Sequence, residues 1–207
     1  MNAFSSRAAL ARWFRSLPAG AAAVALACSV GATAQVVAVP DAHLNHAEGS
    51  VAYAPQGDLE WHDITPKRVL RRGDRLWTDR GSRAEVQAGG HALRIDGQTQ
   101  LTLDNVTDTA TQLSLTQGSV VATVTRVNAG DSFEVGTPNL AFRARQPGDY
   151  RIDVDAKGGT TRVAVLSGTA VVYGEQGEAQ ELKAGQRASF RQRGLAKMKQ
   201  PLFAATD

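Results

Sequence analysis

Side chains that commonly carry catalysis or metal binding are few in this sequence. There is one cysteine, Cys28, and the four histidines are His43, His46, His62 and His91. A cupin-like metal site needs two histidines one residue apart on a strand, a nearby acid and a later histidine. None of the histidines in this sequence belongs to such a set. His43 and His46 could share a metal, but we expect their segment to be unfixed, which gives poor preorganisation. We therefore predict no enzyme, no catalytic residue, no cofactor and no metal site, with a cupin-like metal-dependent enzyme as the weaker alternative.

Trp61 is the candidate contact residue of the sequence. It lies between Glu60 and His62, in a stretch without a clear strand pattern, so its side chain could be exposed. Aromatic side chains with a polar edge are common anchors at protein and sugar contacts. Against this, large aromatic residues most often close a small β core, and the sequence favours that position over a contact role for Trp61 as well. Trp77, in an alternating stretch beside Leu76, is expected to face the core or to line a groove.

In the segments that must position these residues, apolar and polar side chains alternate with a period of two. Residues 93–96 (LRID), 101–104 (LTLD) and 150–155 (YRIDVD) alternate apolar and polar side chains, as strands with one buried face do. Residues that tolerate turn conformations separate them, at Gly89-Gly90, Asp96-Gly97, Gln117-Gly118 and Ser167-Gly168. The pattern predicts an all-β fold, a single twisted β-sandwich or β-solenoid-like domain of about a dozen short strands.

The first residues have the order of a secretory signal peptide. Residues 1–20 contain three arginines and no acid, residues 21–30 are apolar or small, and an A-x-A site ends at Ala34. The apolar run is about half of the ~20 residues that a membrane-spanning helix needs. We therefore expect cleavage after Ala34, a periplasmic location and no transmembrane segment in the mature chain. Cys28 follows a small residue, as in a bacterial lipobox, so a lipoprotein anchored through Cys28 is the alternative.

Charge gives no support to a nucleic-acid partner. The net charge of +3 comes from arginines in residues 1–34, and the rest of the chain balances its basic and acidic residues. Basic residues gather near the C-terminus, where we expect a solvated tail that could also touch anionic lipid weakly. The expected organisation is a signal peptide (1–34), a lead-in segment (35–47), an all-β domain (48–193) and a basic tail (194–207).

Several segments together resemble a FecR-type domain of exported proteobacterial proteins. They are GDRLWTDRGSRAEV (73–86), LRIDGQTQLTL (93–103), LTQGSVVATV (115–124), FEVGTPNLAFRARQPGDYRIDV (133–154), VAVLSGTAVVY (163–173) and LKAGQRASF (182–190). The resemblance implies an all-β, partly solenoid-like periplasmic module. In the best-known setting, a transmembrane helix joins this module to a cytoplasmic anti-sigma segment, and the module receives a signal from an outer-membrane transporter.

The sequence departs from that arrangement before its apolar run. Residues 1–20 are too short for an anti-sigma domain, so we do not expect the chain to hold a sigma factor itself. We predict a non-enzymatic exported binding or adaptor module of FecR type that acts through protein–protein contacts in envelope signalling or assembly. The alternative partner is a glycan, which would make the chain a peptidoglycan- or polysaccharide-binding envelope protein that uses Trp61.

Overall fold

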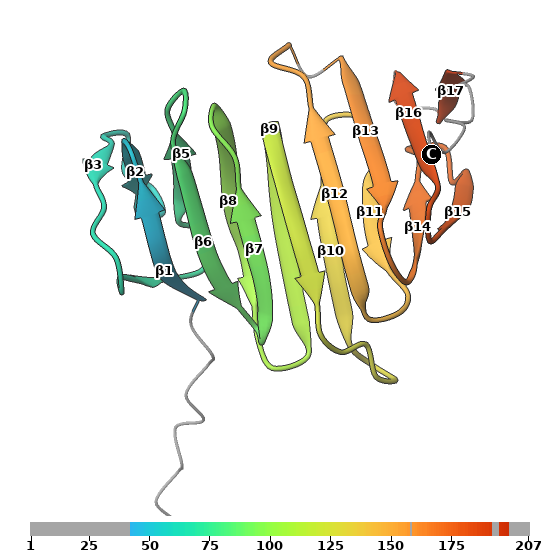
Figure 1. Cartoon of the computed structure of the whole chain (residues 1–207), viewed down its shortest axis with the longest axis horizontal. Helices are drawn as coiled ribbons and strands as arrows, with labels where there is room; N and C mark the ends of the chain where they lie inside the picture. The colour runs from blue at the N-terminus through green and yellow to red at the C-terminus, as the bar shows by residue number, and fades with distance from the viewer. Residues whose placement is uncertain (1–41, 158, 192–194, 199–207) are drawn as a thin grey trace, which may run out of the picture. The chain divides into compact units, whose positions relative to one another are not determined.

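The computed structural model describes residues 42–157, 159–191 and 195–198. All of them belong to the second of two compact units into which the chain divides, residues 37–207. These residues form seventeen strands in one open hydrogen-bonded network and no helix, so the predicted all-β class is confirmed (Figure 1). The expected signal peptide and Cys28 lie outside the described residues.

The strands lie in two facing layers, which Figure 1 shows one behind the other. In order of pairing, the front sheet contains β4 (Val69–Leu70), β1 (Ala42–Glu48), β6 (Arg83–Ala88), β7 (His91–Ile95), the second half of β9 (Ala110–Val124), β12 (Gly148–Val154), β13 (Thr160–Val165), β16 (Arg187–Arg191) and β17 (Ala196–Met198). The back sheet contains β3 (His62–Asp63), β2 (Val51–Ala54), β5 (Arg75–Thr78), β8 (Thr99–Val106), the first half of β9, β10 (Ser132–Gly136), β11 (Ala141–Ala144), β14 (Thr169–Tyr173) and β15 (Ala179–Lys183). As the chain runs from β1 to β17, successive groups of strands lie in turn in the front sheet and in the back sheet.

Strand β9 joins the two layers. Its first half pairs with β8 and β10 in the back sheet, and its second half pairs with β7 and β12 in the front sheet. The strand continues through Gln117-Gly118, where the sequence suggested a turn. Gly118 has a φ of +92°, and a Cβ there would collide with the backbone and side chain of Thr99. A glycine therefore lets the strand change layers without ending.

Alternating side chains fill the space between the layers. Along β12, Tyr150 and Ile152 are fully buried, and along β8 so are Leu101 and Leu103, as their period predicted. The rings of Phe142 and Tyr150 meet edge to face at 5.3 Å between their centroids. Each buried side chain of this size stabilises the fold by about 1.5–3 kcal/mol relative to exposure. The core is one continuous cluster that runs from β1 to β16.

The ordered sheet extends past the expected domain limits at both ends. Residues 42–47, which we assigned to the lead-in, form most of β1, with Ala42 and Leu44 fully buried. A bulge between Leu44 and His46 breaks the alternation of β1, and this hides the strand in the sequence. In the expected basic tail, β17 pairs with β16. The other residues of the lead-in and of the tail lie outside the described residues.

Candidate functional site

Trp61 lies on the surface, in the connection between β2 and β3. Its side chain is 41% exposed, and Leu59 in the same connection is 90% exposed. Exposed hydrophobic residues of this size are few in the part of the chain that the structure describes, the others being Val69 and Leu166. We call Asp58, Leu59, Trp61, His62 and Arg75 together the Trp61 surface.

Asp58 fixes the course of this connection. One carboxylate oxygen, Oδ1, accepts a hydrogen bond from the backbone N–H of Glu60 at 3.0 Å, as in an Asx turn. The other, Oδ2, lies 2.9 Å from Nε2 of His62. These contacts hold the pKa of Asp58 below its ordinary value, the hydrogen bond from His62 more than that from Glu60. Asp58 and His62, which flank the segment with Leu59 and Trp61, are thereby joined to each other.

Arg75 ties the same connection to the back sheet. Its guanidinium carbon lies 5.1 Å from the centroid of the Trp61 ring, and its Nη2 donates a hydrogen bond to the backbone oxygen of Asp58. A cation over an aromatic face at an exposed site is worth about 0.5–1 kcal/mol. Arg75 is the first residue of β5, which pairs with β2, so the ladder places the guanidinium beside the connection. Trp61 is therefore held in place by a residue of the regular sheet.

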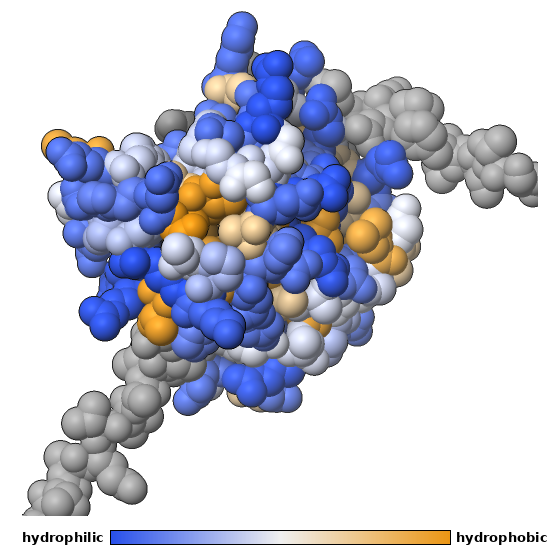
Figure 2. Space-filling model, turned by 60° about the vertical axis from the view of Figure 1, so that its left-hand side comes forward, coloured by the Kyte–Doolittle hydropathy of each residue, from blue (hydrophilic) through white to orange (hydrophobic). Residues whose placement is uncertain are grey.

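Tyr53 anchors the site to the core. Its ring is buried and lies 5.7 Å from the His62 ring, and the guanidinium carbon of Arg68 lies 3.6 Å from the Tyr53 centroid. The 55–61 connection also packs on the turn before β5, since a Cβ at Gly73 would come within 2.6 Å of the Gln56 side chain. Figure 2 brings this end of the sheets forward and shows hydrophobic surface in small areas separated by hydrophilic ones. The site is a small apolar surface with a polar surround.

The four histidines have different surroundings in the structure. His43 and His46 are exposed on β1, and His62 contacts Asp58. His91 is buried with its ring 5.2 Å from that of Phe133, and its Nδ1 accepts a hydrogen bond from the N–H of Thr125. Burial, followed by the nearby charge of Arg126, lowers the pKa of His91. Within residues 42–157, 159–191 and 195–198, no three His, Cys, Asp or Glu side chains are grouped so that they could hold a metal ion.

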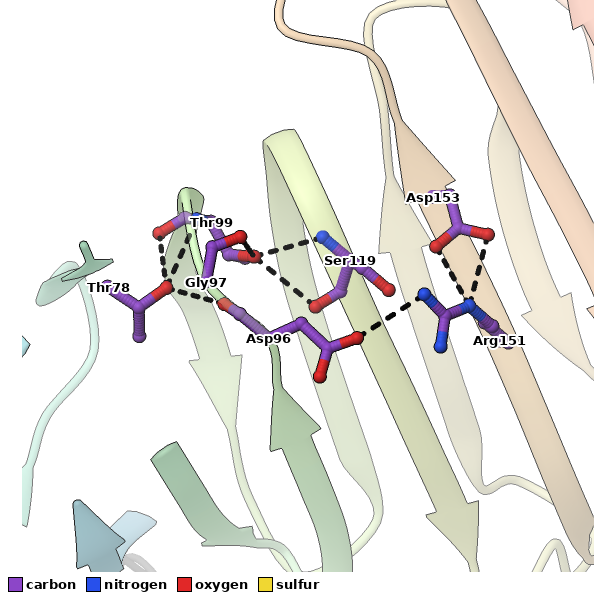
Figure 3. Close-up of polar contacts among 7 residues, drawn as sticks. All are labelled: Thr78, Asp96, Gly97, Thr99, Ser119, Arg151 and Asp153. Atoms are coloured by element: carbon purple, nitrogen blue, oxygen red, sulfur yellow. Dashed lines mark hydrogen bonds and ion pairs between the residues drawn. The ribbon is translucent and has the colours of Figure 1, made fainter. Parts of the chain in front are cut away.

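A polar network lies around the layer change of β9, and sequence reasoning missed it (Figure 3). The Thr78 hydroxyl donates to the backbone oxygen of Asp96 at 2.6 Å and accepts from the N–H of Thr99 at 3.1 Å. In turn, the Thr99 hydroxyl accepts from the N–H of Ser119 at 3.0 Å. Threonine is common in strands, so nothing in the sequence pattern singles these residues out.

Arg151 extends this network across the front sheet. Its Nη2 lies 3.3 Å from Oδ2 of Asp96, and its Nε lies 2.9 Å from Oδ1 of Asp153 (Figure 3). Asp153 is the main cause of the raised pKa of Arg151, although burial opposes it and Asp96 adds to it. Each charge thus has its partner inside the network, which clamps β7 and β12 on either side of β9. We regard this group as structural.

The fold and the Trp61 surface together give a two-layered β module with a small exposed aromatic surface at one end. Residues 74–171 match the family model described as FecR protein, in agreement with the resemblance found in the sequence. Of the Trp61 surface, only Arg75 lies inside the matched residues. No helix in the part of the chain that the structure describes is long and apolar enough to cross a membrane.

Two crystal structures, each described as that of a putative anti-sigma factor from Parabacteroides distasonis ATCC 8503, are similar to this chain. They were determined at 2.50 and 1.65 Å resolution, and each has a TM-score of 0.53, with 15% and 14% sequence identity. In each case the similarity covers 61% of this chain and 58% of the other chain, and at this identity it shows the fold alone. No curated protein matches the sequence.

Proposed function

We propose that the chain is a non-enzymatic regulatory module of FecR type that acts at the cell envelope by binding another protein through the Trp61 surface. The family match and the fold shared with a described anti-sigma factor both support a regulatory class. The observation that carries the proposal is the exposed pair Leu59 and Trp61, held by Asp58, His62 and Arg75. The role is either that of a signalling accessory or that of an assembly adaptor.

The energetics of protein contacts favour such an arrangement. Residues that dominate a binding interface are enriched in tryptophan, tyrosine and arginine, and Trp61 stacks with Arg75. Because the folded chain already orders Trp61, binding would lose less conformational entropy than with a mobile side chain. Burying Leu59, now 90% exposed, would add about 2 kcal/mol of hydrophobic stabilisation.

The same proposal includes export to the periplasm with cleavage after Ala34. The basic, apolar and small residues of the first 34 positions support it. Mass spectrometry of the mature protein tests it, because cleavage would leave Gln35 as the first residue. A lipid-modified Cys28 at the new N-terminus would instead show that the chain is a lipoprotein.

In-cell crosslinking of the tagged chain, with mass spectrometry of the captured proteins, tests the proposed function. We expect one dominant envelope protein, whose capture is lost in Trp61→Ala and kept in Leu166→Ala. Leu166 is a matched control because it is 59% exposed in the turn between β13 and β14. Equal capture by both variants, or no captured protein, would contradict the proposal. Sedimentation with isolated sacculi would then identify a glycan partner.

A further inference from the structure

The short strand β4 forms an open edge of the front sheet. It pairs with β1 on one side, and among the described strands none pairs with its other side. His43 and Val69 are register partners, and the N–H of Leu44 donates to the oxygen of Arg68 at 2.9 Å. In an antiparallel ladder this places the N–H and C=O of Val69 on the side away from β1. Val69 is also 40% exposed, so this edge residue is open to solvent.

Exposed cations flank this edge strand on both sides. Lys67, Arg68, Arg71 and Arg72 are all exposed, and none takes part in an ion pair within the described residues. Arg68 instead covers the Tyr53 ring. Arg94, Arg143 and Arg151, which lie in other strands, each pair with an acid. Four cations without an ion-pair partner among the described residues therefore lie close together in the sequence beside an open strand.

This combination decides which strands the edge can accept. A second copy of the same edge would bring like charges together, and such charges are a common protection against self-pairing. A strand that carries acidic side chains would instead neutralise the arginines while its backbone pairs with Val69. Repulsion of the wrong partner and attraction of the right one both contribute to specificity.

The edge is continuous with the Trp61 surface. Arg71 and Arg72 immediately precede Gly73, which packs against Gln56 in the connection that carries Trp61. Glu60 and Asp63, on either side of Trp61 in the sequence, are exposed acids. They would oppose contact with an anionic lipid surface. An extended peptide can avoid them, because its acids need to lie only beside β4.

We infer that β4 docks an acidic extended segment of the protein partner, which adds a strand to the front sheet beside Val69. This inference rests on the proposed function and names the chemistry of the partner. Strand addition takes its affinity from backbone hydrogen bonds and its specificity from side-chain contacts. Here Arg68, Arg71 and Arg72 select acidic side chains, while Leu59 and Trp61 supply the neighbouring apolar contact.

A peptide titration of the full chain tests the strand addition. The probe is a short synthetic peptide of alternating glutamate and valine, and its control has glutamine in place of glutamate. We expect amide shifts centred on Val69 with the acidic peptide only. Val69→Pro should abolish binding because proline has no N–H, and the fold should survive because this N–H points away from β1. Val69→Ala keeps the N–H and should bind. Equal binding by Val69→Pro would overturn the inference.

Charge reversal tests the selection of acids. Arg71→Glu/Arg72→Glu should weaken binding of the acidic peptide by about tenfold or more. Arg80→Glu/Arg83→Glu changes the net charge equally, at exposed positions in and after the turn that follows β5, and should have little effect. Equal loss in the two double variants, or binding of phosphatidylglycerol vesicles in place of the peptide, would overturn the inference.

The captured protein separates this inference from the proposed function. If crosslinking captures a partner that depends on Trp61 but not on Arg71, Arg72 or the Val69 N–H, strand docking at β4 is wrong and the proposed function stands. If no partner is captured at all, the proposed function fails. A partner lost from both the Trp61→Ala and the Arg71→Glu/Arg72→Glu variants supports both.

Discussion

The guanidinium of Arg75 lies over the ring of Trp61, with its carbon 5.1 Å from the ring centroid. These residues are fourteen positions apart in the sequence, and the pairing of β2 with β5 brings them together. A tryptophan in a long connection thereby takes a defined position. The contact joins the regular part of the back sheet to the surface that we propose for partner binding.

Removing Arg75 should loosen this surface without unfolding the sheet. Arg75→Ala deletes the cation over Trp61 and the hydrogen bond to the Asp58 backbone oxygen. We expect a loss of about 1 kcal/mol in the free energy of unfolding, with faster amide exchange in residues 58–62. Chemical denaturation and hydrogen exchange measure the two effects. Arg80→Ala, an exposed change in the turn after β5, is the control, and equal exchange in both variants would contradict the role of Arg75.

The Asp58–His62 contact should show itself in the titration of Asp58. The hydrogen bond favours the carboxylate, so the pKa of Asp58 lies below its ordinary value of 3.8. The stabilisation is therefore present above the ordinary value and is lost as the pH falls through the lowered one. In His62→Ala we expect the pKa of Asp58 to rise toward 3.8, measured from the chemical shift of its carboxyl carbon. Asp79, whose pKa is lowered mainly by the hydrogen bond from Trp77, should not change. An unchanged pKa of Asp58 would refute the role of His62.

The Thr78 hydroxyl should contribute more to the free energy of unfolding than the hydroxyl of another buried threonine does. Thr78→Val leaves the buried N–H of Thr99 and the oxygen of Asp96 without this partner, at a cost of about 1–3 kcal/mol. Thr111 is the control, because within the described residues its buried hydroxyl has no hydrogen-bond partner. Thr111→Val should be neutral or stabilising. Equal free energies of unfolding for the two variants would argue against the network in Figure 3 as a clamp.

Glycine at position 118 should be required for the layer change of β9. Gly118→Ala adds a Cβ that collides with Thr99 and also imposes strain at a φ of +92°. Gly90 has a φ of +88° with no atom near an added Cβ, so Gly90→Ala measures the backbone strain alone. We expect Gly118→Ala to lower the free energy of unfolding by about 1–3 kcal/mol more than Gly90→Ala does. If chemical denaturation gives similar losses in the free energy of unfolding for the two variants, β9 has room for a side chain at position 118.

Local alternation was enough to predict the all-β class and several strands. The patterns at residues 93–96, 101–104 and 150–155 became β7, β8 and β12, because each strand has one face on a single core. The layer change within β9 could not be predicted, since a glycine that ends a strand and one that redirects it look alike in sequence. Strand β1 was missed because its bulge breaks the period.

The contacts around the candidate site could not be predicted from local sequence patterns. A poor strand context suggested that Trp61 could be exposed, and the structure places it at the surface. Its contact with Arg75 and the stacking of Arg68 on Tyr53 depend on strand pairing between distant segments. The open edge at β4 likewise requires knowledge of which strand lies beside it.

Site-specific photo-crosslinking in the cell tests the central claim most directly. A photoreactive side chain replaces Leu59, which is 90% exposed beside Trp61, or Leu166, which is 59% exposed in the turn between β13 and β14. We predict that the probe at position 59 captures one envelope protein, that Trp61→Ala abolishes this capture, and that the probe at position 166 does not capture that protein. Capture of the same protein from both positions, or of no protein from position 59, would contradict a partner-binding role for the Trp61 surface.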